Sequence, residues 1–447
     1  MGCLLAPLWL AALASATKIG IVGSGVAGSS AAFFLREALG PSADIVVWER
    51  DAVVGGRARS VALGDKQFDG GATAISSLNE YLMNATAGMQ RRDDAGGDLG
   101  VFDGATFRFL SSERALPLAA RVVARYGFAP ARVLPALKQT VANLSRVYDL
   151  QRADVAFDTP ESLFRALGLY ELTQVTAYDH FKSLGVPDDF VKEFVDGASR
   201  DNYNQDGGMN AFADMVSLAG AALAGEVFEL AGGTVQIPAK YLADARADVR
   251  LGTEVVAIDG SAPPYVVVDA AGRREHVDAV IVATPLEFTS LSLPETAVAA
   301  AKRPYEPNYV AFAAGALNGT IFGDRAADLD AVLTVDGVDF SCIGAHGSEG
   351  GDRVYKVMSR SRLSDARIDE LFEARASPIA RVDWNATGAY PVLAPTPGAA
   401  WPPFVLGDGV YYANMEVPVS CMETEIIAAK NAALLAAARL REASGDY

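Results

Sequence analysis

One stretch near the start of the chain restricts its possible folds more than any other. Lys18 to Val22 reads as a buried parallel strand, and the run Gly23-Ser24-Gly25-Val26-Ala27-Gly28 follows it at once. In such a run the first glycine permits a tight turn, the second lets the backbone approach a pyrophosphate, and the third lets a helix pack close to the strand. Residues 29–39 are helix formers, and Gly40-Pro41 ends them.

A second strand follows this helix and ends in an acid. Ile45 to Trp48 is apolar, and Glu49 lies 21 residues beyond Gly28. A carboxylate at that distance can accept hydrogen bonds from both ribose hydroxyls of a nucleotide. The stretch therefore predicts a dinucleotide site, and its expected contacts are Gly23, Ser24, Gly25, Ala27, Gly28, Glu49 and Arg50.

The next stretch indicates which dinucleotide binds. Gly55-Gly56-Arg57 and Phe68-Asp69-Gly70-Gly71-Ala72 follow the second strand closely. Glycine lets the backbone touch a cofactor, and a guanidinium can hold a phosphate with two parallel bonds. The segment resembles that of the FAD-dependent amine oxidase and desaturase superfamily, which implies FAD as the cofactor. The alternative is a glycine-rich surface loop with a solvated arginine. The contacts expected here are Gly56, Arg57, Gly71, Ala72 and Thr73.

Composition and charge restrict the functional class. A chain of 447 residues with 51% hydrophobic residues is long enough for two globular domains. Its net charge of −17 argues against nucleic acids and anionic membrane surfaces as partners. Without a CxxC pair or a His/Cys cluster, no metal site is expected. No stretch reaches the roughly 18 apolar residues that a transmembrane helix needs, and the sequence does not indicate the oligomeric state.

The N-terminus predicts export. Leu4 to Leu13 is an apolar run, and Ala14-Ser15-Ala16 is a small-x-small cleavage site, so residues 1–16 read as a signal peptide. An apolar extension of the first strand is the alternative. Four N-glycosylation sequons begin at Asn84, Asn143, Asn318 and Asn385. We therefore expect the lumen of the secretory pathway, the lysosome or vacuole, or secretion.

The periodicity of the remaining chain predicts two interleaved domains. The predicted fold class is α/β, with an FAD-binding Rossmann-like (GxGxxG) domain and a discontinuous, mixed α/β, partly helical substrate domain. We assign residues 17–75, 230–290 and 401–447 to the first domain and 76–229 and 291–400 to the second. Residues 76–225 read as a helical cap, because apolar residues recur at helical spacing in four stretches separated by polar breaks, which are 115–126, 132–148, 162–167 and 188–197.

Later segments supply further expected cofactor contacts. Val249 to Ile258 reads as one strand, and Val280 to Ala283 ends a buried strand at Thr284-Pro285. Ser420 to Glu423 reads as a capping box, and a helix follows from Thr424 to Ala437. The positive end of such a helix could face the flavin, or the cap could serve stability alone. Val255, Thr284 and Met422 join the expected contacts.

More particular stretches resemble one family over nearly the whole mature chain. These stretches are Arg200-x-Asn202-Tyr203-x-Gln205, Asn210-Ala211-Phe212, Val216-Ser217-Leu218, Ile281 to Leu286, Leu317-Asn318-x-Thr320-Ile321-Phe322, Tyr411-Tyr412, Glu416, Ser420 and Met422-Glu423. The chain resembles the prenylcysteine oxidase (farnesylcysteine lyase) family.

This resemblance implies non-covalent FAD, with Glu416 as one more cofactor contact. It implies cleavage of the thioether of S-farnesyl- or S-geranylgeranyl-cysteine with O2, during degradation of prenylated proteins. The products would be cysteine, a prenyl aldehyde and H2O2. A flavin amine or polyamine oxidase, and a catalytically silent flavin-binding glycoprotein, remain the alternatives.

The polar stretch from Arg200 to Gln205 supplies the expected substrate contacts, which are Arg200, Asn202, Tyr203 and Gln205. A guanidinium can hold the carboxylate of a cysteine with two parallel bonds, so Arg200 is the expected carboxylate ligand. The alternative is that Arg200 forms an ion pair with a nearby acid, such as Asp201 or Asp196.

Overall fold

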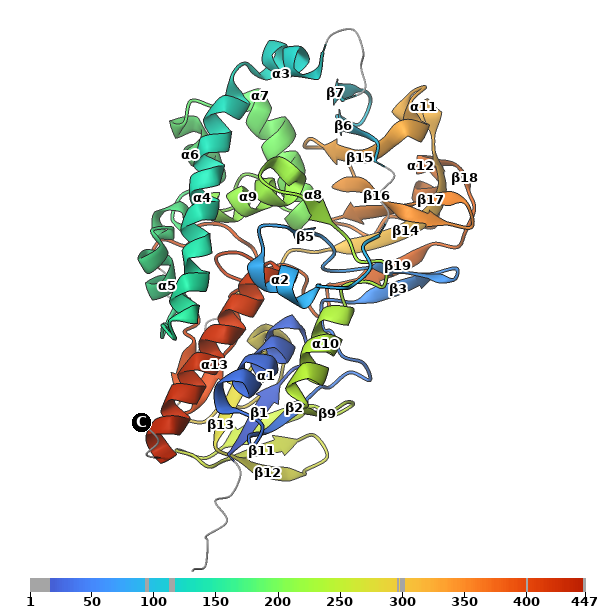
Figure 1. Cartoon of the computed structure of the whole chain (residues 1–447). Coiled ribbons are helices and arrows are strands. Elements are labelled where there is room, and N and C mark those ends of the chain that lie inside the picture. The colour runs from blue at the N-terminus through green and yellow to red at the C-terminus, as the bar shows by residue number, and fades with distance from the viewer. Residues whose placement is uncertain are drawn as a thin grey trace, which may run out of the picture.

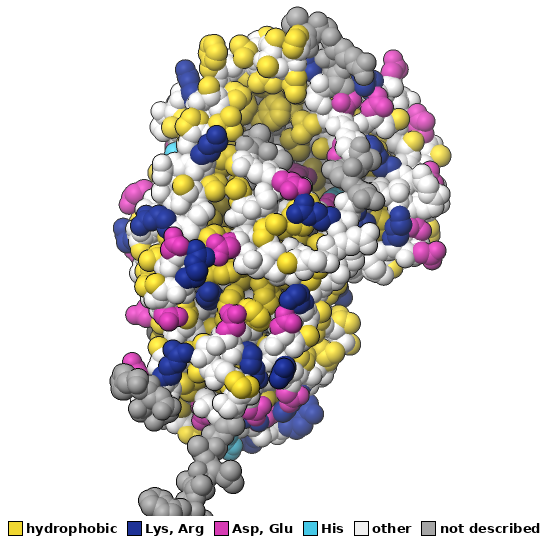
Figure 2. Space-filling model, in the orientation of Figure 1, with side chains coloured by type: hydrophobic (Ala, Val, Ile, Leu, Met, Phe, Trp, Pro, Cys, Tyr) yellow, Lys and Arg dark blue, Asp and Glu magenta, His cyan; other side chains and the backbone are white. Residues whose placement is uncertain are grey.

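The protein has two lobes that both contain segments from distant parts of the chain (Figure 1). The computed structural model describes residues 17–92, 96–111, 117–295, 297, 302–398 and 401–444, so the expected signal peptide 1–16 lies outside the described residues. The lower lobe in the view holds the N-terminal glycine motif and the C-terminal helix. The upper lobe is hollowed between its helices and its sheet, and hydrophobic side chains line the visible hollow (Figure 2).

The lower lobe is built on a six-stranded sheet. Its order is β20 (Val405–Gly407), β21 (Val410–Tyr412), β13 (Ala279–Val282), β1 (Lys18–Val22), β2 (Asp44–Trp48) and β9 (Asp248–Arg250). All neighbours are parallel except β20 and β21. The unit β1, α1 (Val26–Leu39) and β2 confirms the predicted strand–helix–strand, and α1 begins three residues earlier than expected, directly after Gly25.

Both faces of this sheet are buried, which explains the continuous apolar runs in its strands. Ile19 and Ile21 face α1 and α13 (Met422–Ser444), whereas Val22 and Trp48 face a second, antiparallel sheet. That sheet consists of β10 (Val255–Asp259), β11 (Tyr265–Asp269) and β12 (Arg274–Val277).

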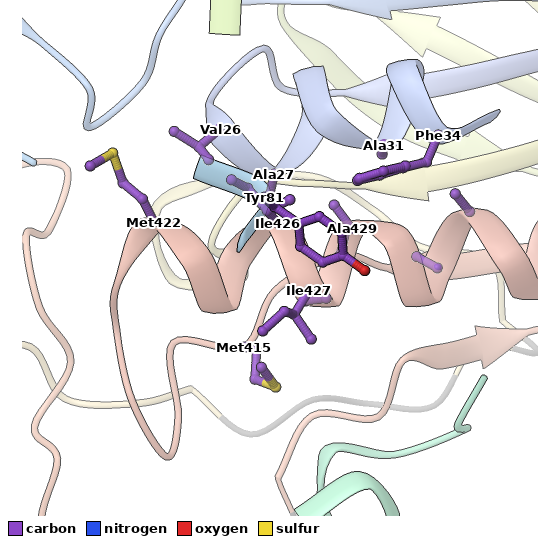
Figure 3. Close-up of a cluster of buried hydrophobic side chains, with 14 of the residues drawn as sticks. Val26, Ala27, Ala31, Phe34, Tyr81, Met415, Met422, Ile426, Ile427 and Ala429 are labelled. Carbon is purple, nitrogen blue, oxygen red and sulfur yellow. The ribbon is translucent and has the colours of Figure 1, made fainter. Parts of the chain in front are cut away.

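Helices from the two ends of the chain pack against each other. Figure 3 shows Ala27 and Ala31 of α1 facing Ile426 and Ala429 of α13, with small side chains at the crossing. Alanines allow the helix axes to approach closely, and the larger side chains fill the flanks. α10 (Gln236–Ala245) and α2 (Glu80–Ala85) complete this core.

The upper lobe is built on a larger sheet. Its order is β18 (Phe372–Arg375), β14 (Tyr309–Leu317), β17 (Asp352–Ser359), β16 (Cys342–Glu349), β15 (Leu329–Thr334), β6 (Asp98–Phe102) and β7 (Phe107–Leu110), and β19 (Ala380–Asp383) also pairs with β14. The helices α11 (Gly319–Phe322) and α12 (Asp365–Leu371) accompany it. Two short pairs, β3 (Ser60–Leu63) with β4 (Lys66–Asp69) and β5 (Ile75–Ser76) with β8 (Val227–Phe228), connect the lobes.

The expected helical cap is present beside this sheet. Its helices are α3 (Leu118–Tyr126), α4 (Ala129–Arg152), α5 (Pro160–Leu167), α6 (Ala177–Ser183), α7 (Asp188–Phe190), α8 (Asp196–Tyr203) and α9 (Ala211–Leu218). A π-helical turn over Val191–Val195 joins α7 to α8 where one continuous helix was expected. Among the described residues, no helix has the length and apolarity needed to cross a bilayer.

Two sequence predictions are corrected by the fold. Residues 98–110 form the strands β6 and β7 and join the large sheet, although they lie in the segment 76–225 that is expected to be a helical insertion. Val249 to Ile258 is not one strand, because Gly252 adopts a positive φ of 61° and separates β9 from β10, which belong to different sheets. An apolar pattern that continues through a turn does not show where one strand ends and the next begins.

The close packing of α1 against the first turn gives a testable prediction. A Cβ atom on Gly28 would lie 1.9 Å from the carbonyl oxygen of Gly23. We expect Gly28→Ala to destabilise the protein by at least the roughly 1–3 kcal/mol typical of overpacking, and to lower its flavin content. Thermal denaturation and flavin absorbance measure both effects. Gly319→Ala is the control, because its new methyl group would meet only the end of the Glu373 side chain; equal melting temperatures for both variants would contradict the prediction.

Candidate active site

The glycine turn forms one end of a cavity between the lobes. Gly23 adopts a φ of 104° and its N–H donates to the Trp48 carbonyl at 2.8 Å, which turns the chain from β1 towards α1. The N–H groups in the first turn of a helix have no partners within the helix, so they are free to bind an anion. Gly25 precedes α1 and lines the cavity, whereas Gly28 packs against Gly23 and does not line it.

Glu49 stands beside this turn at the end of β2. One carboxylate oxygen accepts hydrogen bonds from the Ser24 N–H at 3.0 Å and the Ser24 hydroxyl at 2.7 Å, and the other accepts from the Asp51 N–H at 2.9 Å. The carboxylate is therefore fixed in place while it borders the cavity. Ser24 was expected to touch the cofactor itself, but it is fully buried and instead orients Glu49.

The cavity has a volume of about 1800 Å³, its open mouth included. It extends from the glycine turn to the face of the upper sheet. Thirteen of the sixteen expected cofactor residues line it, and these are Gly23, Gly25, Ala27, Glu49, Arg50, Gly56, Arg57, Gly71, Ala72, Thr73, Val255, Thr284 and Met422. Ser24, Gly28 and Glu416 do not line it and lie directly behind residues that do.

A buried network of charges holds Arg57 in the cavity wall. Its guanidinium forms an ion pair with Glu416, which is fully buried, and donates to the Ala389 carbonyl at 3.0 Å. Arg303 lies 3.5 Å from the other oxygen of Glu416, and the Tyr305 hydroxyl donates to the same carboxylate. A buried carboxylate needs such partners, because an unpaired charge in the interior is strongly destabilising. Glu416 therefore positions Arg57 for an anionic ligand.

The N-terminus of α13 reaches the same cavity. Ser420, Cys421 and Met422 line it, as expected for a helix end that faces a cofactor. The predicted capping box is wrong in its details, because Glu423 turns away and accepts from the Tyr81 and Leu82 N–H groups at 2.9 and 3.0 Å. Those are the first N–H groups of α2, so Glu423 caps that helix instead, and Thr424 receives the Cys421 N–H at 3.3 Å.

The far side of the cavity is formed by the upper lobe. Tyr203 and Tyr390 line it, with ring centroids 5.5 Å apart and planes at 86°. Val310 of β14 and Met358 of β17 face each other in the register of the sheet and supply an apolar surface. The amide oxygen of Asn308, which is buried at the start of this surface, has no hydrogen-bond partner within the described residues. A bound molecule could supply that partner.

The expected substrate residues divide into two groups. Asn202 and Tyr203 line the cavity, whereas Arg200 and Gln205 do not. The Arg200 guanidinium pairs with Asp336, donates to the Thr334 carbonyl at 2.7 Å and lies 3.9 Å from Asp196. Arg200 therefore forms ion pairs with acids instead of lining the cavity, and the expected Asp196 is one of them. Its main partner, Asp336, was not among the acids expected from the sequence.

Gln205 forms hydrogen bonds with the chain segment that follows Tyr390. Its amide N–H donates to the Pro391 carbonyl at 3.0 Å, and its oxygen accepts from the Leu393 N–H at 2.8 Å. These two bonds fix the segment that carries Tyr390. Gln205 thus supports an aromatic wall of the cavity from behind.

Sequence reasoning missed several residues that line the cavity, among them Asn308, Lys356, Met358, Trp384, Tyr390 and Glu425. One signal was available, because Val354-Tyr355-Lys356-Val357-Met358 places a lysine in the middle of an otherwise apolar run. The others carry no local pattern, since their positions depend on contacts between distant segments.

The residues on this cavity fit FAD. The fit rests on a glycine turn closed by Gly28, a fixed carboxylate at the ribose position, and a half-buried arginine beside glycine backbone. The length of the cavity, from Glu49 to the sheet that carries Met358, gives room for a dinucleotide with its ring system against the upper lobe. Fold and site together define a flavin-dependent oxidoreductase.

Comparisons with known proteins agree with this class of enzyme and indicate the family within it. A model of the prenylcysteine lyase family matches residues 109–446, and one of the NAD(P)-binding Rossmann-like domain matches residues 21–86. The chain is 30% identical to farnesylcysteine lyase of Arabidopsis thaliana, covering 95% of this chain and 89% of that protein. It is 29% identical to prenylcysteine oxidase 1 of Homo sapiens, covering 94% and 88%.

Solved structures share the fold at lower identity. Cyclohexylamine oxidase from Brevibacterium oxydans IH-35A superposes with a TM-score of 0.64 at 16% identity, covering 95% of this chain and 99% of that one. Putrescine oxidase superposes with a TM-score of 0.60 at 15% identity, over the same shares of the two chains. The chain belongs to the prenylcysteine lyase family.

Two buried acids at the start of α13 give a prediction about pH. Burial and the neighbouring Glu416 raise the pKa of Glu425 to about 8, and burial raises the pKa of Glu423 to about 7, from an ordinary value of 4.5. Between about pH 4.5 and pH 8 the folded protein therefore binds more protons than the unfolded chain. The resulting stabilisation is fully present below about pH 4.5, falls as the pH rises, and is lost once the pH has passed about 7 to 8.

We expect the melting temperature of the holoprotein to fall between about pH 5 and pH 8, and Glu425→Gln to reduce that fall. Glutamine can still accept the Met415 N–H, which lies 3.2 Å from the Glu425 carboxylate, but it does not ionise. Differential scanning fluorimetry across the pH range measures the slope. Glu171→Gln, at an exposed position in the 3-10 turn Tyr170–Thr173, is the control. A slope that Glu425→Gln leaves at the wild-type value would contradict the assignment.

Proposed function

We propose that this protein is an FAD-dependent thioether oxidase that cleaves S-prenyl-L-cysteine, with a farnesyl or geranylgeranyl chain. With O2 and water the products are cysteine, a prenyl aldehyde and H2O2. The proposal places the enzyme at the end of the degradation of prenylated proteins. Its relatives named farnesylcysteine lyase and prenylcysteine oxidase 1 support it.

The observation that carries the proposal is the chemistry of the upper-lobe wall. Its described lining residues are Asn202, Tyr203, Asn308, Val310, Lys356, Met358, Trp384, Thr387, Ala389 and Tyr390. This set combines apolar and aromatic surface with one cation and contains no acid. Such a wall suits an apolar chain with an anionic head group. It lacks the carboxylates that would bind a polycation, which disfavours the polyamine oxidase alternative.

The ionisation states of the wall suit a reaction that needs little acid–base catalysis. Burial raises the pKa of Tyr390 to about 12 and raises that of Tyr203 well above its usual range, so both are neutral phenols at physiological pH. Burial also raises the pKa of the Cys421 thiol. None of these three groups is therefore an ionised nucleophile or base at neutral pH.

Bound FAD would supply the redox chemistry, accepting a hydride from the carbon attached to sulfur and passing the electrons to O2. The protein's own contribution is to position the thioether and exclude bulk water. The perpendicular pair Tyr203 and Tyr390 lines the cavity at its upper-lobe end, and Gln205 holds the segment that carries Tyr390. Val310 and Met358 offer an apolar surface to the prenyl chain.

Anaerobic bleaching of the flavin tests the proposal. We expect the protein to purify yellow, and S-farnesyl-L-cysteine to reduce its flavin while spermine does not. Stopped-flow absorbance near the flavin maximum measures the rate, and admission of air should restore the colour and release H2O2. Bleaching by spermine alone would favour an amine oxidase, and bleaching by neither compound would favour a silent flavoprotein.

We further propose that the protein functions in the secretory lumen or a lysosome-like compartment. The sequon residues Asn84 and Asn385 are exposed, whereas Asn143 is half-buried. Asn318 uses its amide to cap α11 and to reach the Glu370 carbonyl at 2.9 Å, so a glycan there would cost those bonds. The greater stability expected at acidic pH also suits such a compartment.

Glycan analysis tests this localisation. We expect peptide N-glycosidase F to increase the electrophoretic mobility of protein made in eukaryotic secretory cells, and Asn84→Gln with Asn385→Gln to remove most of that shift. Asn318→Gln should remove little of it. An N-terminus that begins at Met1, on protein that resists the glycosidase, would contradict lumenal targeting.

A further inference from the structure

The proposed substrate carries a carboxylate that needs a cation in the cavity, and Arg200 lies away from the cavity wall. We propose that Lys356 of β17 holds the α-carboxylate of the substrate amino acid and thereby selects free prenylcysteine. This inference rests on the proposed function. It deepens that function by naming the residue that recognises the head group.

The contacts of Lys356 leave its charge available. The ammonium donates to the Thr73 hydroxyl at 3.1 Å and approaches the Gly71 carbonyl at 3.4 Å, and it lies 6.0 Å from the centre of the Phe312 ring. These partners carry no formal charge. An ammonium has three N–H donors, so one donor and the whole positive charge remain for a ligand. The side chain is half-buried and lines the cavity.

Two neighbouring acids, Asp69 and Glu229, act on Lys356 through their charge without pairing with it. One oxygen of Asp69 accepts hydrogen bonds from the backbone and the hydroxyl of Thr234, at 2.9 and 3.1 Å, and the other has no partner within the described residues. Burial raises the pKa of Asp69 to about 6, so its negative charge is weakened. Glu229 pairs with His346 at 2.5 Å and with Arg92 at 3.2 Å. Within the described residues, neither forms an ion pair with Lys356. A substrate carboxylate would therefore meet a cation whose charge is not already neutralised.

The other cations on the cavity belong to its cofactor end. Arg57 forms an ion pair with Glu416. Arg50 follows Glu49 directly and donates to the Phe288 carbonyl at 3.0 Å. Arg59 follows Arg57 by two residues on the same glycine-rich segment. Lys356 is the one cation among the described lining residues that comes from the upper sheet.

The position of Lys356 matches the dimensions of the substrate. In S-prenylcysteine the carboxylate lies only a few covalent bonds from the carbon that is oxidised, so its ligand must stand at the border of the cofactor. Lys356 contacts Gly71 and Thr73, which lie on the segment expected to touch the flavin. On the same face of β17, Met358 meets Val310 in register and provides the adjoining apolar surface for the chain.

Two substrates and three variants test the inference. Steady-state kinetics of the holoenzyme compare S-farnesyl-L-cysteine with S-farnesylcysteamine, which lacks the carboxylate. We expect Lys356→Met to lower kcat/KM for farnesylcysteine by about 10- to 100-fold, which is the loss expected for one charged hydrogen bond. Most of this loss should be a rise in KM. Activity on farnesylcysteamine should stay unchanged. Lys356→Arg should retain most of the preference, and Lys356→Gln serves if the methionine variant does not fold.

Other results would overturn the inference in distinguishable ways. An equal loss on both substrates, with a shifted flavin absorption spectrum, would assign Lys356 to the cofactor. An unchanged preference in Lys356→Met, with the preference lost in Arg59→Met, would transfer the role to Arg59. A wild-type enzyme that oxidises farnesylcysteine, but no better than farnesylcysteamine, would refute carboxylate recognition and leave the proposed function standing. A wild-type enzyme that oxidises neither compound would overturn the proposed function together with this inference.

Discussion

The ion pair between the half-buried Arg57 and the fully buried Glu416 is the interaction on which the site depends. It joins a loop near the N-terminus to the segment before the last helix, and without Arg57 the buried Glu416 carboxylate would lose its closest cation. Arg303, Tyr305 and Asn414 complete the network around Glu416, so it is anchored in three separate parts of the chain. The cofactor end of the cavity is thus held by charges, while the lobes themselves are held by apolar packing.

The two walls of the cavity differ in the flexibility that their composition allows. The cofactor wall is made of backbone at glycine turns and of fixed charges, which suits a ligand that stays bound. The upper wall is made of Met358, Val310 and two tyrosines, whose apolar and aromatic surfaces adapt to chains of different length. A flexible prenyl chain gains affinity from burial on such a wall without the need for specific hydrogen bonds.

The nucleotide end of the site could be predicted from sequence because its residues act locally. The glycine turn, Glu49 and the Gly55-Gly56-Arg57 segment are close in sequence, and each has a conformational reason to be the residue it is. The substrate end could not be predicted in the same way. Lys356, Asn308 and Tyr390 meet only through the register of β14 and β17 and the clamp by Gln205. Arg200 illustrates the limit, because its buried guanidinium pairs with the exposed Asp336 and donates to the Thr334 carbonyl, and it does not line the cavity.

The packing of α13 against α1 has a consequence for biosynthesis. The parallel sheet takes strands from the beginning, the middle and the end of the chain, and the small-residue face of α1 is covered by the last helix to leave the ribosome. At ordinary rates of translation, the glycine motif therefore waits on the order of tens of seconds before its core can close. During that interval its apolar strands and the unpaired edge of β1 are exposed, as in other topologies dominated by non-local contacts. The cofactor site is therefore completed only after the start of α13 has been made, because Ser420, Cys421 and Met422 form part of its lining.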